Sequence, residues 1–155
     1  MKKALALTMI ASTLVFAGTT TSSTTVTATT EPTCSIANSP TLSLDFNGLS
    51  DSTSSFNVDI VCSSGLAYTM TVDGGANPSG ELRRATDGTN FITYRLFSDA
   101  AMTTELGAAT GNQITGSGTD NLETINIYTK VAIVDNSPLP PIGTYSDTLT
   151  VTLSW

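Results

Sequence analysis

Apolar and polar residues alternate with a period of two along most of this chain, and this pattern limits the fold more than any other feature. The alternation is clearest in residues 55–62, 66–73, 91–97, 124–134 and 145–155, with a shorter run at 41–46. A period of two gives each strand one buried face and one wet face, as in antiparallel sheets packed against each other. Beyond the first 17 residues, no window of twelve shows helical spacing.

The alternation also assigns a core face to each run. The predicted core residues are Leu42, Leu44 and Phe46; Phe56, Val58, Ile60 and Cys62; Leu66, Tyr68, Met70 and Val72; Ile92, Tyr94 and Leu96; Ile125, Ile127, Thr129, Val131 and Ile133; and Leu149, Val151, Leu153 and Trp155. Turn signals separate the runs at Asp73-Gly74-Gly75, Asn77-Pro78, Asp87-Gly88 and Gly116-Ser117-Gly118. We therefore predict an all-β, immunoglobulin-like sandwich of about seven short strands.

The first 17 residues have the composition of an export signal. Lys2 and Lys3 precede an apolar stretch at 4–17, which is shorter than the roughly 20 residues that a membrane-spanning helix needs. A basic start, a short apolar core and a small-residue exit are typical of a secretory signal peptide. Cleavage after Ala17 or after Ala28 fits the pattern, so we expect a signal at 1–17, a Thr/Ser-rich segment at 18–33 and one domain at 34–155.

Export gives a meaning to the two cysteines, Cys34 and Cys62. The compartment beyond the membrane is oxidising, and two cysteines allow one intramolecular disulfide. A metal pair or a reactive thiol is the alternative, but the chain has no histidine and no further cysteine to complete such a site. We predict a structural disulfide.

Composition excludes several functional classes. Without histidine there is no Ser-His-Asp or Cys-His machinery and no His-ligated zinc. The net charge is −7, and it becomes −9 when Lys2 and Lys3 leave with the signal, which argues against a nucleic-acid partner.

The remaining polar residues suggest no chemistry. We interpret Asp45, Asp59, Asp99 and Asp147 as residues of solvated strand faces or as turn caps, and Asp73, Asp87 and Asp120 as turn residues. The pair Arg83-Arg84 is expected to decorate a turn beside Asp87, and Trp155 to face the core. The sequence thus predicts no enzyme and no cofactor or metal.

Two features remain unexplained by a closed sandwich. The Thr/Ser tract at 19–33 is too polar to form a core, yet Ser22, Thr24, Val26, Ala28 and Thr30 would share one face of a strand. The strongest alternating run stops at Trp155, so we expect one edge and one groove of the sandwich to stay open. An exposed edge invites pairing with another chain.

Five stretches of the chain form recognisable motifs: Thr33-Cys34-Ser35-Ile36, Val61-Cys62, Val72-Asp73-Gly74-Gly75, the stretch from Tyr94 to Ala101 (Tyr-x-Leu-Phe-x-Asp-Ala-Ala), and the ending from Gly143 to Trp155 (Gly-x-Tyr-x-Asp-x-Leu-x-Val). Together they resemble the spore coat protein U domain family, which includes subunits of archaic chaperone–usher pili. The resemblance covers roughly Val26 to Trp155, and both cysteines occupy the positions of the family's disulfide partners.

The resemblance implies an incomplete immunoglobulin-like sandwich that is completed by donor-strand exchange. A periplasmic chaperone would lend a strand, and at the outer-membrane usher the N-terminal segment of another pilin subunit would replace it. Carried over by position, the donor segment is about 20–30, with Thr24, Val26 and Ala28 facing the groove. The strand that contacts the chaperone would carry Leu149, Val151, Leu153 and Trp155.

The sequence thus supports two functions. The first is a structural pilus subunit, exported to the periplasm and then to the cell surface, that supports adhesion and biofilm formation. The second is a monomeric secreted β-sandwich that binds a carbohydrate or a surface. They differ in whether residues 20–30 pair with another molecule.

Overall fold

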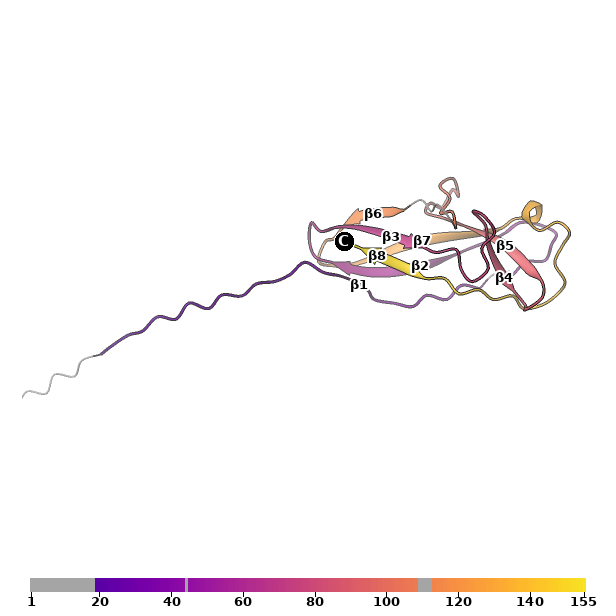
Figure 1. Cartoon of the computed structure of the whole chain (residues 1–155). Coiled ribbons are helices and arrows are strands. Elements are labelled where there is room, and N and C mark those ends of the chain that lie inside the picture. Colours follow the sequence, from indigo (N-terminus) through magenta and orange to yellow (C-terminus); the bar gives the residue numbers. More distant parts are fainter. Residues whose placement is uncertain (1–18, 44, 109–112) are drawn as a thin grey trace, which may run out of the picture. The chain divides into compact units, whose positions relative to one another are not determined.

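The computed structural model describes residues 19–43, 45–108 and 113–155, and the predicted signal peptide lies outside them. The chain divides into two units, Met1–Thr30 and Glu31–Trp155 (Figure 1). In the first unit, residues 19–30 are exposed and form neither helix nor strand.

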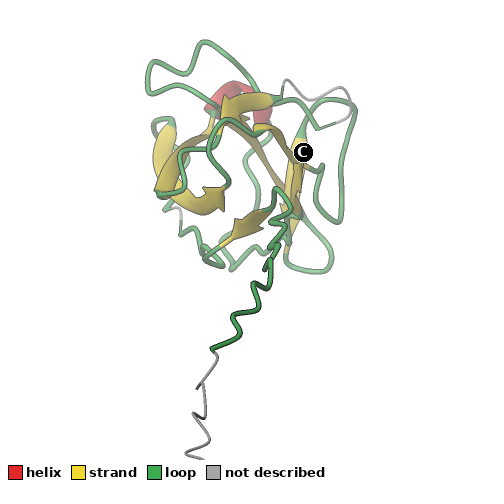
Figure 2. Cartoon of the chain, turned by 90° about the vertical axis from the view of Figure 1, so that its left-hand side faces the viewer, coloured by secondary structure: helices red, strands yellow, loops and turns green. Residues whose placement is uncertain are grey.

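The second unit contains two antiparallel sheets (Figures 1 and 2). Its elements are β1 (Cys34–Ile36), β2 (Ser52–Cys62), β3 (Ala67–Val72), β4 (Arg83–Thr86), β5 (Phe91–Phe97), β6 (Ile114–Ser117), β7 (Leu122–Val131), the 3₁₀ turn η1 (Ile133–Asp135) and β8 (Val151–Ser154). One sheet has the order β1-β2-β7-β5-β4 and the other β6-β3-β8. The all-β prediction is confirmed.

The core lies between the inward faces that the alternation assigned. Buried side chains come from every second position of β2, β3 and β7, and from the end of β5. They include Phe56, Val58, Ile60 and Cys62; Tyr68, Met70 and Val72; Tyr94, Leu96 and Phe97; and Ile127, Thr129 and Val131. The long pairing of β2 with β7, from Ser52↔Val131 to Val61↔Leu122, fixes this face along ten residue pairs.

The prediction was wrong at 41–46 and at 116–117. The described residues of 41–46 form no strand, although Leu42 and Phe46 pack against the core. There the alternation reflects burial without strand pairing. Gly116 and Ser117 belong to β6 rather than to a turn, and Gly116 pairs with Tyr68. A Cβ at Gly116 would overlap the Tyr68 ring, so this glycine makes room for an aromatic neighbour.

Thr129 is a polar residue in an apolar position. It is 0 % exposed, and its Oγ1 is a buried side-chain oxygen without a hydrogen-bond partner within the described structure. Thr129→Val keeps the shape and removes the unsatisfied hydroxyl, so we expect the free energy of unfolding to rise by about 1 kcal/mol. Urea unfolding would measure it.

The matched control is Thr124→Val on the same strand. The Thr124 hydroxyl donates to Asp59 Oδ1 at 2.7 Å on the outer face, so its loss gives no gain. Equal or lower stability of Thr129→Val relative to the wild type would contradict the assignment of a destabilising hydroxyl.

Candidate functional site

The strand β8 has a partner on one side. It pairs with β3 in the register Met70↔Leu153 and Val72↔Val151, and among the described residues no strand lies along its other edge. Asp73 N donates to Thr150 O at 3.0 Å, so the backbone groups of Thr150 face β3. Because these groups alternate sides in an antiparallel pair, those of Val151 and Leu153 point away from β3, at the free edge.

A second free edge lies next to the first. β1 pairs with β2, and it lies beside β8 although the two strands belong to different sheets (Figure 1). Ser63 N donates to Thr33 O at 2.9 Å, and Ala37 N donates to Asp59 O at 2.7 Å. The backbone groups of Cys34 and Ile36 therefore point away from β2. Unpaired edges of this kind are templates for strand addition.

Apolar side chains near these edges are incompletely covered. Leu149, Val151 and Leu153 are half-buried against the core. Ile36 on β1 is 38 % exposed and Trp155 is 59 % exposed. The prediction that Trp155 faces the core was wrong, because β8 ends at Ser154 and the indole lies beyond the paired strand.

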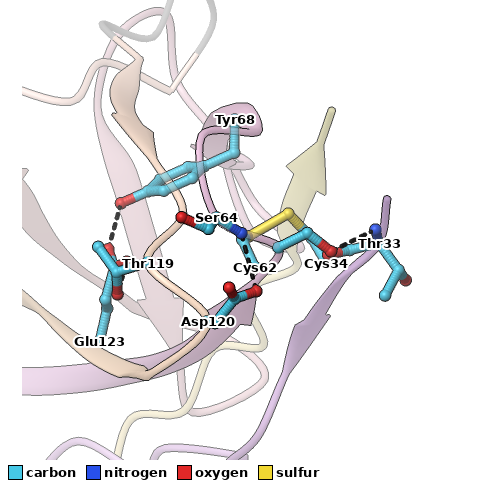
Figure 3. Close-up of a disulfide and its surroundings, with 9 residues drawn as sticks. Thr33, Cys34, Cys62, Ser64, Tyr68, Thr119, Asp120 and Glu123 are labelled. Atoms are coloured by element: carbon cyan, nitrogen blue, oxygen red, sulfur yellow. Dashed lines mark hydrogen bonds between the residues drawn. A yellow bond between two sulfur atoms is a disulfide. The ribbon is translucent and has the colours of Figure 1, made fainter. Parts of the chain in front are cut away.

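The predicted disulfide is confirmed and holds the beginning of β1 (Figure 3). Cys34 and Cys62 are paired opposite each other with a Cα–Cα distance of 4.1 Å, and both are buried. Thr33 N donates to Ser63 Oγ at 3.0 Å, and Ser64 N donates to Asp120 Oδ1 at 2.8 Å. The chain that follows the Thr/Ser tract is thus tied to β2.

The last run of the chain is divided between the two sheets. Ser146 exchanges two backbone hydrogen bonds of 2.9 Å with Thr86 of β4, in the five-stranded sheet. By Thr150 the chain has reached β3, in the three-stranded sheet. Residues 146–150, the crossover segment, therefore pass from one sheet to the other, and the predicted continuous strand at 145–155 was wrong.

Three side chains hold the crossover segment, and we call Asp73, Tyr94 and Asp147 the crossover cluster. Asp147 accepts hydrogen bonds from Tyr94 Oη at 2.7 Å and from the amides of Ala76 and Thr148 at 2.8 Å. Asp73 Oδ1 accepts from Thr150 N at 2.9 Å and from Gly75 N at 3.0 Å. Asp147 is therefore no solvated strand residue.

The local sequence around Asp73 explains how the carboxylates fit. Gly75 has φ +74°, and a Cβ there would overlap the Asp147 carboxylate. Burial alone would raise the pKa of Asp73, but the hydrogen bonds from Thr150 and Gly75 outweigh it and lower that pKa. Burial, followed by the hydrogen bond to Asp147, raises the pKa of Tyr94, so its hydroxyl stays a donor.

Arg83 contacts the cluster through the Asp73 carbonyl, and its position corrects the turn interpretation. It is 0 % exposed on β4, and it donates to the carbonyls of Asp73 and Val72 at 2.8 Å, of Gly107 at 3.2 Å and of Leu106. Burial lowers its pKa. Its neighbour Arg84 stacks 4.4 Å from the centroid of Phe91 and donates to Asn77 O at 3.0 Å.

A shallow depression of about 420 Å³ lies apart from these edges, and ion pairs line it. Arg95 contacts Asp135 at 2.7 Å and Glu105 at 3.0 Å, and Lys130 contacts Asp51 at 2.8 Å. The hydrogen bond from Arg95 lowers the pKa of Asp135. The charged side chains that line the depression are therefore paired with one another.

The remaining site predictions concern the Thr/Ser tract and bound metal. Thr24, Val26 and Ala28 are exposed, and Val26 is 88 % exposed, but their pairing with another chain stays a prediction. Within residues 19–43, 45–108 and 113–155, no three His, Cys, Asp or Glu side chains gather as metal ligands. The same residues contain no helix long and apolar enough to cross a membrane.

Comparison with solved structures places the fold. The chain is similar to the crystal structure of the CsuC–CsuE chaperone–tip adhesion subunit pre-assembly complex from archaic chaperone–usher Csu pili of Acinetobacter baumannii, with a TM-score of 0.58 and 21 % identity. The match covers 80 % of this chain and 40 % of that chain. A chaperone–tip adhesin complex of CFA/I fimbriae matches at a TM-score of 0.45 and 14 % identity, over 79 % of this chain and 41 % of that one.

At the level of sequence, no curated protein matches. The family model described as Spore Coat Protein U domain matches residues 20–152, which confirms the resemblance. The match includes the disulfide, the crossover cluster and the first two residues of β8, and the chain therefore belongs to the Spore Coat Protein U domain family.

Proposed function

We propose that the mature protein is a structural subunit of a surface pilus and that it polymerises by strand exchange. The segment at 18–33 of one copy pairs with the free edge of β8 in the next copy. The subunit reaches the periplasm by its signal peptide, is received there by a chaperone and is assembled at an outer-membrane usher. The fibre then supports adhesion and biofilm formation.

The observation that carries this proposal is the unpaired edge of β8. Its outward backbone groups belong to Val151 and Leu153, whose side chains are half-buried. An added strand would gain main-chain hydrogen bonds there and cover apolar surface in the same step, which is how strand addition combines affinity with specificity.

The Thr/Ser tract has the properties of a donor. Residues 19–30 are exposed and belong to no strand. The sixteen residues at 18–33 could reach on the order of 50 Å when extended. Threonine is a good strand former, and Val26 and Ala28 give one face apolar side chains.

The proposed partners follow from the same edge. The similar solved structure is a complex of a chaperone with a pilus subunit. A free apolar edge is an aggregation hazard in the periplasm, so a chaperone that covers it before assembly has a physical reason to exist.

Val26→Asp tests the donor register. A carboxylate on the face that enters an apolar groove costs several kcal/mol, so we expect incorporation into fibres to stop while chaperone binding persists. The matched control is Thr27→Asp, which places the same charge on the opposite face and is expected to leave fibre yield near the wild-type level. Immunoblots of sheared surface fractions would measure both variants. Normal fibre yield from Val26→Asp would refute the register.

Purification of the mature chain separates the two candidate functions. We expect it to form ladders on electrophoresis that resist sodium dodecyl sulfate and disappear on heating. N-terminal sequencing belongs to the same experiment, because cleavage after Ala28 would leave five residues before Cys34, too few to donate. A stable monomer that retains residues 18–33 and ignores added donor peptide would instead favour the secreted binding module.

A further inference from the structure

The free edge of β8 needs support that a neighbouring strand does not supply. β8 is four residues long and pairs with β3 alone among the described strands. A short edge strand tends to fray, and fraying would displace the outward backbone groups of Val151 and Leu153. An incoming strand would then have to order β8 while it binds, which would cost conformational entropy.

The crossover cluster supplies this support, in part through Tyr94 of the five-stranded sheet, which is the sheet opposite β8. Tyr94 is 6 % exposed and belongs to β5, inside the five-stranded sheet, yet its hydroxyl reaches Asp147 in the crossover segment. Asp73 holds Thr150, the residue that immediately precedes β8, through both its backbone amide and its carboxylate. The beginning of β8 is thus fixed from two sides.

We propose that Asp73, Tyr94 and Asp147 are positioning residues for strand addition, holding β8 against β3 so that its free edge is in place before a second strand arrives. This inference rests on the proposed function and deepens it. The cluster touches no incoming strand, and its effect on assembly runs entirely through the position of β8.

Tyr94→Phe is the sharpest test because it removes one hydroxyl and keeps the buried ring. The matched control is Tyr68→Phe, since Tyr68 is also buried but donates to Glu123 of β7, at 3.3 Å. Both changes delete a tyrosine hydroxyl bonded to a carboxylate, but the first alone touches the crossover segment. Asp147→Ala serves as a second variant.

Two measurements on the full mature chain distinguish positioning from general stability. The first is amide hydrogen exchange at Thr152 and Ser154, whose N–H groups face β3, in the monomer fraction from gel filtration. The second is the rate at which polymer ladders form. We expect Tyr94→Phe to raise the exchange rate at these amides about tenfold and to slow ladder formation about tenfold, with exchange in β2 and β7 unchanged. Tyr68→Phe should match the wild type in both.

The other outcomes overturn the inference in distinguishable ways. If the wild type assembles and Tyr94→Phe matches it in assembly and in β8 exchange, the cluster has no positioning role. If Tyr68→Phe slows assembly as much as Tyr94→Phe, the effect is one of general stability. A wild-type chain that neither assembles nor binds a peptide of residues 19–33 overturns the proposed function together with this inference.

Discussion

Arg83→Met is expected to lower the free energy of unfolding by about 3–5 kcal/mol. The guanidinium is 0 % exposed, and four backbone carbonyls accept hydrogen bonds from it. Methionine can fill much of the volume but donates nothing, so these carbonyls lose a partner. Leaving a buried acceptor unsatisfied costs about 1–3 kcal/mol. Urea unfolding of the full mature chain, followed by tryptophan fluorescence and circular dichroism, measures the change.

The neighbouring residue provides the control for this prediction. Arg84→Met makes the same replacement on the same strand, where the side chain is half-buried and stacks on Phe91. Loss of that stacking and of one hydrogen bond to Asn77 is expected to cost about 1 kcal/mol. If the two variants were equally stable, Arg83 would not be the buried anchor described above.

Arg83 also shows the limit of predicting buried residues from sequence patterns. The core faces of β2, β3, β5 and β7 were predictable because apolar residues occupy every second position and hydrophobic burial follows that period. β4 reads Arg-Arg-Ala-Thr and has no such pattern. Its buried residue is charged, and the carbonyls that accept from it are 10 to 24 positions away in the sequence. No local sequence pattern indicates that backbone carbonyls from other segments come together around this side chain.

The end of the chain shows a second limit. Alternation from 145 to 155 predicted one strand, because Leu149, Val151 and Leu153 do share a face. The structure divides this run between two sheets, and the division depends on Asp147 and Asp73. Their contacts with Tyr94 and Thr150 join residues 53 and 77 positions apart. The sequence signal that accompanies these contacts is Gly75, because a side chain at this position would overlap the Asp147 carboxylate.

Of the candidate site, the sequence located the strand edge and the disulfide but not the cluster that supports the edge. The disulfide followed from the presence of two cysteines in a chain that its first 17 residues predict to be exported. The edge strand could be located because Leu149, Val151 and Leu153 alternate with polar residues, and β8 lies within that run. β1 was missed because three residues are too few to show a period, and its strand character depends on pairing with β2.

The Cys34→Ala/Cys62→Ala double variant is the second large effect, with an expected loss of about 3–4 kcal/mol in the free energy of unfolding. The disulfide closes a loop with a sequence separation of 28, and its removal raises the chain entropy of the unfolded state. Replacing both cysteines avoids a free thiol that could cross-link subunits. Urea unfolding of the oxidised wild type and of the variant measures the difference.

Reduction separates the loss of the covalent bond from the loss of the side chains. Dithiothreitol should bring the free energy of unfolding of the wild type to within about 1 kcal/mol of that of the variant and leave the variant unchanged, since the alanines remove little buried volume.

A further consequence concerns β1, which joins the Thr/Ser tract to the domain through three paired residues. In the proposed fibre, tension on a donated tract would reach Cys34 first, and the disulfide would pass it directly to β2 and its ten-residue pairing with β7. Fibres of the variant should therefore break at lower force, and equal breaking force in an optical trap would mean that β1 alone carries the load.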